Sequence, residues 1–197
     1  MAVALAFSPP VATDDELLAS LAGGDRRALD ELFKRYRLLA YRVAHRLLGN
    51  EADALDAVQD GFIKALTHLS GFQGRSTFKT WLLRVVSNAA LDLGRQRGRR
   101  EMLTLEGATA GEGEQANLLT LENASAGLER EDLRQALNRA LALLPEAQRR
   151  TFVLHADAEL SYREVAEVLG ISIGTVMSRL YYARQRLRVH LEKWMKQ

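Results

Sequence analysis

The side chains that usually carry out catalysis are few and scattered in this chain. Its 197 residues include no cysteine and only four histidines, and these histidines show no spacing typical of a metal site. The sequence contains neither a glycine-rich phosphate loop nor a nucleophile elbow. We therefore predict no catalytic residue, no metal site and no cofactor, and we do not expect an enzyme. The absence of cysteine also suits a reducing compartment, which favours a cytoplasmic protein.

Binding to duplex DNA is the first function that the residue pattern indicates. The stretch 161–180, SYREVAEVLGISIGTVMSRL, has the pattern of two short helices with a tight turn at Gly170. Ile171 and Ile173 are expected to fix this turn to the core, and Ser172 can cap the second helix. Polar and basic side chains that suit phosphates and base edges follow: Thr175, Ser178, Arg179, Arg184, Arg186 and Arg188. The stretch therefore predicts a DNA-binding helix-turn-helix.

A second stretch, 70–100, combines aromatic and basic residues. Phe72, Phe78 and Trp81 accompany a glycine-containing loop, and four arginines gather between positions 95 and 100. Single-stranded DNA needs both features, because unstacked bases stack on aromatic rings and phosphates attract cations. Phe72 and Trp81 can also be core residues, and for Trp81 a core position is favoured.

Helical periodicity runs through most of the chain and would position these residues. Thr13 is expected to cap a first helix, and further helices are expected over 25–48, from Asn50 and over 77–97. Helical pattern resumes at 129, with a break at Leu144–Pro145, and no stretch alternates like a β-strand. The stretch 101–128 is rich in small and polar residues and carries five glutamates but no lysine or arginine.

We therefore predict an all-α fold of two small helical domains, at 13–100 and 129–197. A flexible acidic linker at 101–128 would join them, and a disordered tail would occupy 1–12. No segment is long and apolar enough to cross a membrane, so we expect a soluble protein without membrane insertion.

The helix that starts after Asn50 shows two distinct faces. Its apolar residues at helical spacing are expected to be buried: Leu55, Val58, Phe62, Leu66 and Leu69. Asp56, Gln59 and Asp60 gather with Lys64 on another face. Gly61 lies mid-helix, where glycine costs about 1 kcal/mol relative to alanine. Either a partner backbone approaches closely at Gly61, or the glycine is a tolerated defect.

Five segments, in order, carry a resemblance to a known family: DAVQDGFIKAL, FKTWLLRVVSNAALD, LPEAQRRTFVLH, LSYREVAEVLGISIGTVMSRL and ARQRLR. They look like bacterial RNA polymerase sigma factors of the extracytoplasmic-function (ECF) type. The resemblance runs from about residue 13 to 191 and fails only in the linker. It implies a transcription initiation factor that binds core RNA polymerase and selects promoters by reading a minus-thirty-five duplex and melting a minus-ten element. A stand-alone helix-turn-helix regulator that does not act through core polymerase is the alternative.

The resemblance also implies roles for individual residues. Asp56, Gln59 and Asp60 match the surface that grips the β′ clamp helices of the polymerase. The residues implied to bind the minus-ten element, partly as single-stranded DNA, are Phe72, Arg75, Ser76, Lys79, Arg84, Asn88, Asp92 and Arg95. Those implied to bind the minus-thirty-five duplex are Ser161, Tyr162, Ser172, Thr175, Met177, Ser178, Arg179, Tyr182 and Arg184.

The same resemblance implies further partners, and the sequence departs from the family pattern in its recognition helix. The second domain would lean on the polymerase β-flap, an anti-sigma factor would hold the protein inactive, and the acidic linker would lie in the RNA channel. Many family members carry a basic residue where Met177 and Tyr182 stand. The family's rules for the minus-thirty-five sequence are therefore not expected to transfer to this chain.

Overall fold

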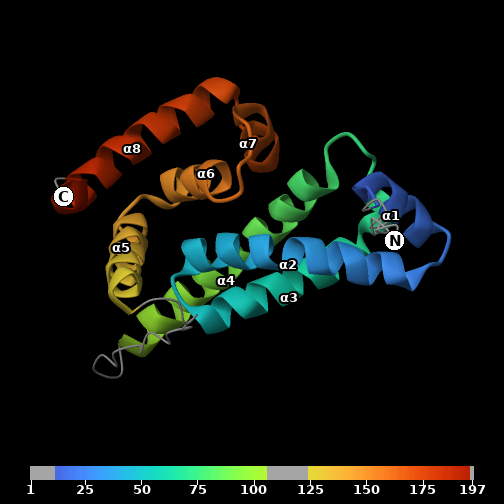
Figure 1. Ribbon diagram of the computed structural model, residues 1–197, viewed down its shortest axis with the longest axis horizontal. Coiled ribbons are helices and arrows are strands. Elements are labelled where there is room, and N and C mark those ends of the chain that lie inside the picture. The colour runs from blue at the N-terminus through green and yellow to red at the C-terminus, as the bar shows by residue number, and fades with distance from the viewer. Residues whose placement is uncertain (1–11, 106–123, 196–197) are drawn as a thin grey trace, which may run out of the picture. The chain divides into compact units, whose positions relative to one another are not determined.

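The structure is a computed structural model that describes residues 12–105 and 124–195, and these residues form helices without any β-strand. The helices are α1 (Asp14–Ala22), α2 (Arg26–Leu48), α3 (Glu51–Thr67), α4 (Phe78–Leu105), α5 (Ala124–Ala142), α6 (Glu146–Ala156), α7 (Tyr162–Leu169) and α8 (Ile173–Met195), with a short 3-10 turn, η1, at Leu69–Gly71 (Figure 1). The predicted all-α fold is confirmed. No helix among these residues is both long enough and apolar enough to cross a lipid bilayer.

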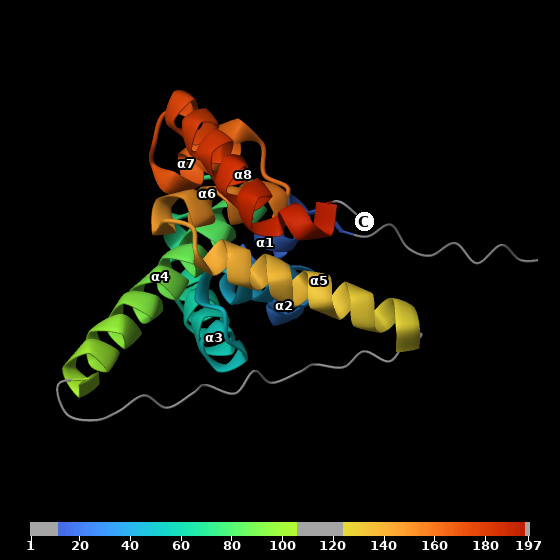
Figure 2. The ribbon, with the colours of Figure 1, turned by 90° about the vertical axis from the view of Figure 1, so that its left-hand side faces the viewer.

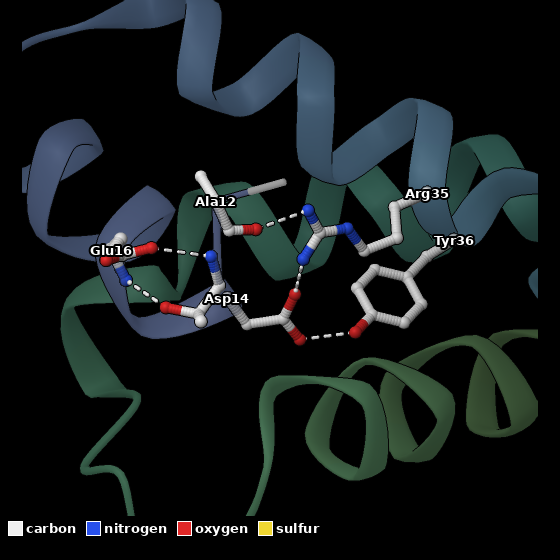
Figure 3. Close-up of polar contacts among 6 residues, drawn as sticks. Ala12, Asp14, Glu16, Arg35 and Tyr36 are labelled. Carbon is white, nitrogen blue, oxygen red and sulfur yellow. Dashed lines mark hydrogen bonds and ion pairs between the residues drawn. The ribbon is translucent and has the colours of Figure 1, made fainter. Parts of the chain in front are cut away.

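The chain divides into two compact units, 1–37 and 38–197. In the first unit, Thr13 caps α1 as predicted and forms a reciprocal capping box with Glu16. Asp14 accepts hydrogen bonds from the Tyr36 hydroxyl and from Arg35 Nη1, the latter at 2.5 Å (Figure 3). Arg35 Nη2 also donates to the carbonyl of Ala12 at 2.6 Å. These bonds hold the start of α1 against α2.

In the second unit, α3 and α4 pack along each other at very short range. A Cβ placed on Gly61 would lie 2.8 Å from Cγ2 of Val86 and 3.0 Å from its Cα. Such distances are too short for any real side chain, so Gly61 is required by the approach of α4. The close backbone belongs to the chain itself rather than to another protein.

The small residues of α3 decide which of its faces is buried. Ala54, Ala57, Val58, Gly61, Phe62 and Ala65 face inward. The prediction that Leu55 and Leu66 are buried is wrong, because their side chains are 52% and 38% exposed. Leu69 is half-buried. Helix α3 turns its narrow alanine and glycine face toward α4, and this rotation leaves the two leucines at the edge.

Helices α5 to α8 also belong to the second unit, with α8 packed on α5, α6 and α7 (Figure 2). A core of Ala140, Leu141, Leu144, Ala183 and Leu187 joins α5, the turn after it and α8. Gly170 ends α7 with a left-handed backbone (φ 64°), which an L side chain adopts only at a cost. The predicted helix-turn-helix is confirmed. Ile173, expected to fix the turn to the core, is instead 43% exposed because it opens α8 on the solvent side.

Both ends of the predicted linker are helical. Helix α4 continues to Leu105, and α5 begins at Ala124. The rest of the linker, 106–123, and the predicted tail up to residue 11 lie outside the described residues. The exact domain boundaries stay predictions.

Candidate nucleic-acid interface

The surface implied to bind polymerase lies on the outer side of α3. Asp56, Gln59 and Asp60 are all exposed. Lys64 pairs with Asp60 one turn away, with 2.7 Å between Nζ and Oδ2, and this bond raises the pKa of Lys64. Gln59 lies one turn from Leu55 on one side and one turn from Ile63 on the other. The corrected rotation of α3 thus places apolar side chains beside the polar ones, which sequence reasoning had not predicted.

A groove between α3 and α4 brings together residues assigned to different partners. Asp56, Asp60 and Lys64 line its α3 wall, and Asp92, Arg95 and Arg99 lie on its α4 wall. The first wall belongs to the polymerase-binding set, whereas Asp92 and Arg95 belong to the minus-ten set. The two predicted surfaces therefore lie side by side.

The aromatic residues near the start of α4 form one cluster. The ring centroids of Phe72 and Trp81 are 5.3 Å apart, and Phe78 lies 6.1 Å from Phe72 and 5.8 Å from Trp81. Phe78 is buried, whereas Phe72 and Trp81 are half-buried. The cluster therefore anchors the loop to α4 and still leaves part of two rings accessible.

The loop beside this cluster and the first turn of α4 carry three polar members of the minus-ten set. Arg75 is exposed, and Ser76 and Lys79 are half-buried. Thr77 ends the loop as the cap of α4, because its hydroxyl accepts a hydrogen bond from the backbone N–H of Thr80 at 3.1 Å. The loop therefore enters the helix in a fixed direction.

The face of α4 that carries Arg84, Asn88, Asp92 and Arg95 is exposed, as the helical spacing predicts. Two of these residues nevertheless have partners on α6. Asn88 Oδ1 accepts a hydrogen bond from Arg150 Nη2 at 2.5 Å, and Arg95 Nη2 lies 2.8 Å from Oε1 of Glu146. Sequence reasoning missed this pairing, since no pattern near Arg150 indicates a partner 62 positions away.

The surroundings of Arg150 disfavour its positive charge. Burial, together with the cations of Arg95, Arg84 and Arg179, lowers the pKa of its guanidinium to about 10, and Glu146 opposes this shift. Its Nη2 also donates to Ser87 Oγ at 3.2 Å. Its Nε is buried and has no hydrogen-bond partner within the described part of the chain. The arginine remains charged near neutral pH, in surroundings that are already positive.

Three further polar contacts link the helices of the two predicted domains. Thr80 donates to Oε1 of Glu164 at 3.2 Å. Arg46 Nε lies 3.4 Å from Oδ1 of Asp157, and Arg46 also donates to Asn138. All of these bonds lie within the unit 38–197. The domain arrangement therefore depends on more than one contact.

The start of α8 presents short polar groups, as predicted. Ser172 Oγ accepts from the backbone N–H of Thr175 at 3.1 Å, and the two hydroxyls lie 2.9 Å apart. Ser178 is exposed and donates to the carbonyl of Thr175. Arg179 is half-buried, and Arg184 is exposed. Donors and cations thus lie along the exposed side of this helix.

Apolar and aromatic side chains share the exposed surface of α8. Met177 and Tyr182 are 55% and 54% exposed, and Tyr181, which the sequence analysis did not single out, is 58% exposed. The rings of Tyr181 and Tyr182 meet edge to face with centroids 5.4 Å apart. Gln185 donates to the Tyr181 hydroxyl at 2.7 Å and restrains that ring.

Two residues assigned to DNA binding at the start of α7 have structural partners. Ser161 forms a capping box with Glu164, whose pKa the Ser161 hydroxyl lowers. Tyr162 packs against the ring of His155 at 5.0 Å. Contact of Ser161 and Tyr162 with DNA stays a prediction.

Comparison with known proteins identifies both helical domains. The family model described as Sigma-70 region 2 matches residues 32–100, and that described as Sigma-70, region 4 matches residues 134–187. RNA polymerase sigma-H factor of Pseudomonas aeruginosa is 32% identical over 187 residues, which are 93% of this chain and 96% of that protein. ECF RNA polymerase sigma-E factor of Escherichia coli is 33% identical over 177 residues, 89% of this chain and 92% of that protein.

Two solved structures of similar fold are complexes with another protein. CnrH in complex with the cytosolic domain of CnrY matches with a TM-score of 0.68 and 27% identity, over 91% of this chain and 97% of that chain. The sigma factor RpoE in complex with the anti-sigma factor NepR from Bartonella quintana matches with a TM-score of 0.63 and 26% identity, over 82% of this chain and 97% of that chain. Matches to both regions, in the expected order, support a transcription initiation factor over a stand-alone regulator. The chain belongs to the sigma-70 family of RNA polymerase sigma factors and is of the ECF type.

Proposed function

We propose that this chain acts in the cytoplasm as the promoter-specificity subunit of RNA polymerase, with its surfaces assigned residue by residue. Asp56, Gln59 and Asp60 bind the β′ clamp helices. The groove shared by α3 and α4 carries this proposal, because Asp60 on one wall and Arg95 on the other lie where polymerase and melted DNA would be adjacent. Binding to polymerase would thereby position the DNA-reading face of α4.

The loop at 71–77 and the exposed face of α4 capture the opened minus-ten strand. Unstacking a base costs a few kcal/mol, which stacking on half-buried rings and phosphate contacts can offset. Phe72 and Trp81 provide the rings. Asn88 can both donate to and accept from the edge of a flipped base, because its side chain is an amide.

Helices α7 and α8 read the minus-thirty-five element as duplex. Ser172, Thr175 and Ser178 present short polar groups where a recognition helix enters the major groove, and Arg184 supplies charge for phosphates. This domain would also contact the polymerase β-flap, and the acidic linker would lie in the RNA channel. An anti-sigma factor is a further proposed partner, since the similar sigma factor RpoE was solved in complex with the anti-sigma factor NepR.

Transcription with purified core polymerase tests this proposal. We expect the chain to direct initiation from a subset of a promoter library, whereas core polymerase alone starts without selection. The variant carrying Gln59→Ala and Asp60→Ala is the matched control, since it alters only the proposed clamp surface. Failure of the unaltered chain to bind core polymerase would contradict the proposal.

A further inference from the structure

An apolar strip runs along the exposed surface of α8, the helix proposed to read the minus-thirty-five duplex. Ile173, Met177 and Tyr181 follow one another at intervals of four residues, so their side chains lie on one side of the helix. All three are exposed, Met177 by 55%. We call these three residues the apolar strip. Its middle member is the one that carries a sulfur atom.

The sulfur atoms of this chain are all thioethers. The sequence has no cysteine and four methionines, which are Met1, Met102, Met177 and Met195. No thiol therefore competes for an oxidant, and the methionines are the side chains on which a hydroperoxide acts first. Met177 is the methionine that lies in a predicted DNA-binding surface, and its exposure allows a hydroperoxide to reach it.

Hydrogen peroxide oxidises a thioether by transferring one oxygen atom. A lone pair of the sulfur attacks one peroxide oxygen, and the S–O bond forms as the O–O bond breaks. The departing oxygen takes the proton of the transferred one and leaves as water. The sulfur loses two electrons and the peroxide gains them. The product, methionine sulfoxide, is polar, and sulfoxide reductases convert it back to methionine.

We propose that Met177 is an oxidation site within the minus-thirty-five reader, and that its conversion to the sulfoxide changes the base that α8 prefers. This inference rests on the proposed function of α8. It goes beyond that function by assigning a redox-dependent specificity to one side chain, with a hydroperoxide as the class of substrate.

The two forms of Met177 suit different base edges. The thioether is apolar and fits the methyl group of thymine, which is the apolar feature of the major groove. The sulfoxide oxygen accepts hydrogen bonds and donates none, so it suits the amino groups that cytosine and adenine present in that groove. Oxidation therefore removes an apolar contact and adds a hydrogen-bond acceptor at the same place.

The neighbours of Met177 leave the added oxygen available to DNA. Ile173, one turn before it, has no polar group in its side chain. Ser178 already donates its hydroxyl to a backbone carbonyl of the helix. The hydroxyl of Tyr181 is held toward Gln185, whose Nε2 lies 2.7 Å away. Donors on the bases can therefore meet the sulfoxide oxygen.

The test uses the full chain after treatment with hydrogen peroxide. Catalase removes the peroxide before core polymerase is added, and mass spectrometry of the digested chain measures the sulfoxide at Met177. Binding of the complete holoenzyme is then measured to promoter duplexes that carry thymine, uracil, cytosine or 5-methylcytosine at each position of the element in turn. This series varies the methyl group and the amino group independently.

Met177→Leu is the matched control. It keeps an apolar side chain at 177 and the other three methionines of the chain, but it has no sulfur at this position. Any change that peroxide causes through the other methionines therefore appears in this variant as well.

At one position of the element, the unoxidised chain should bind thymine about fourfold more tightly than uracil, in keeping with one buried methyl group. Oxidation should abolish that difference and raise the ratio of cytosine binding to uracil binding about fivefold, in keeping with one hydrogen bond. The oxidised chain should bind 5-methylcytosine like cytosine. Sulfoxide reductase should restore the original ratios, and Met177→Leu should keep its own ratios after peroxide treatment.

The inference is wrong if peroxide leaves Met177 unoxidised, if oxidation leaves every base ratio unchanged, or if Met177→Leu shows the same change. These three outcomes leave the proposed function of α8 intact, provided that the unoxidised holoenzyme distinguishes bases of the element. A holoenzyme that distinguishes no base of the element before oxidation would overturn both the proposed function and the inference.

Discussion

Gly61 of α3 and Val86 of α4 lie so close that a single added methyl group would overlap the valine. The Cβ of an alanine at 61 would lie 2.8 Å from Val86 Cγ2 and 3.0 Å from its backbone Cα. A side-chain atom could rotate away, but the backbone atom cannot move without shifting α4. The two helices carry the proposed polymerase-binding and promoter-reading surfaces, so this contact fixes how those surfaces are placed.

We predict that Gly61→Ala destabilises the protein. Alanine would gain about 1 kcal/mol of helix propensity, but overpacking of a tight core typically costs about 1–3 kcal/mol. The net change in the free energy of unfolding should therefore be unfavourable, and urea denaturation measures it. Gly98→Ala in α4 is the control, since nothing lies within 4 Å of its added Cβ. Equal stabilisation by both substitutions would contradict the close approach.

We predict that His45 makes the protein less stable at mildly acidic pH. Burial lowers the pKa of His45, and the cations of Arg134 and Arg46 lower it further. The unfolded chain therefore binds a proton more readily than the folded one, and stability falls as the pH drops below the unfolded value of about 6.5. Urea denaturation measures the stability of the unaltered chain and of His45→Gln at pH values above and below about 6.5. The stability of the variant should depend less on pH.

The exposed His190 provides the comparison for this experiment. If His190→Gln flattens the profile as much as His45→Gln does, the effect does not come from burial at His45.

Local features of the fold were predictable from sequence, whereas long-range ones were not. Caps and turns depend on residues that are close together in the sequence, and each predicted role is confirmed for Thr13, Ser172 and Gly170. The sequence did not predict the rotation of α3, because a leucine such as Leu55 fits the apolar spacing of a helix as well as a smaller apolar residue does. What decides the buried face is the close approach at Gly61, and that depends on α4.

The same contrast between local and long-range features holds for the candidate site. The shared face of Arg84, Asn88 and Asp92 follows from helical spacing alone. The partners of Asn88 and Arg95 on α6 could not be predicted, because a contact between distant helices leaves no periodic signal near either residue. The sequence therefore predicted which face of α4 is exposed, but not the α6 residues that contact it.

We predict that the surface on α3 binds core polymerase through both polar and apolar groups. Gln59→Ala with Asp60→Ala should weaken binding, and Ile63→Ser should weaken it further because Ile63 is 55% exposed on the same outer surface. Surface plasmon resonance with immobilised core polymerase measures the change. Glu167→Ala, an exposed acidic residue of α7, should bind as the unaltered chain does. Unchanged affinity for the α3 variants would remove these residues from the interface.

We predict that Asn88 discriminates one base of the minus-ten element. Asn88→Ala should preserve binding to core polymerase and reduce open-complex formation. Preference at one minus-ten position should relax by about 1–3 kcal/mol, the usual worth of a base contact. Permanganate footprinting of promoters varied at each minus-ten position measures both effects. Identical opening of every variant promoter by the two proteins would show that Asn88 reads no base.

We predict that Met177 contacts a thymine methyl group in the major groove of the minus-thirty-five element. Its side chain is 55% exposed on α8, one turn from Tyr181 and beside the polar groups at the start of the helix. Apolar side chains in a recognition helix favour thymine, whose methyl group is the apolar feature of the groove. Burying one methyl group is worth about 0.8 kcal/mol, or roughly a fourfold change in affinity.

Replacing thymine by uracil in the duplex tests this contact, because uracil lacks only the methyl group. At one position of the element, the full chain bound to core polymerase should lose about fourfold in affinity, in keeping with one buried methyl. Met177→Ala should remove that loss, while Thr175→Ala should weaken binding to both duplexes equally and leave the ratio intact. If Met177→Ala keeps the full difference between thymine and uracil at every position, the methyl group is read by another residue, and Tyr182, which is 54% exposed, is the next to substitute.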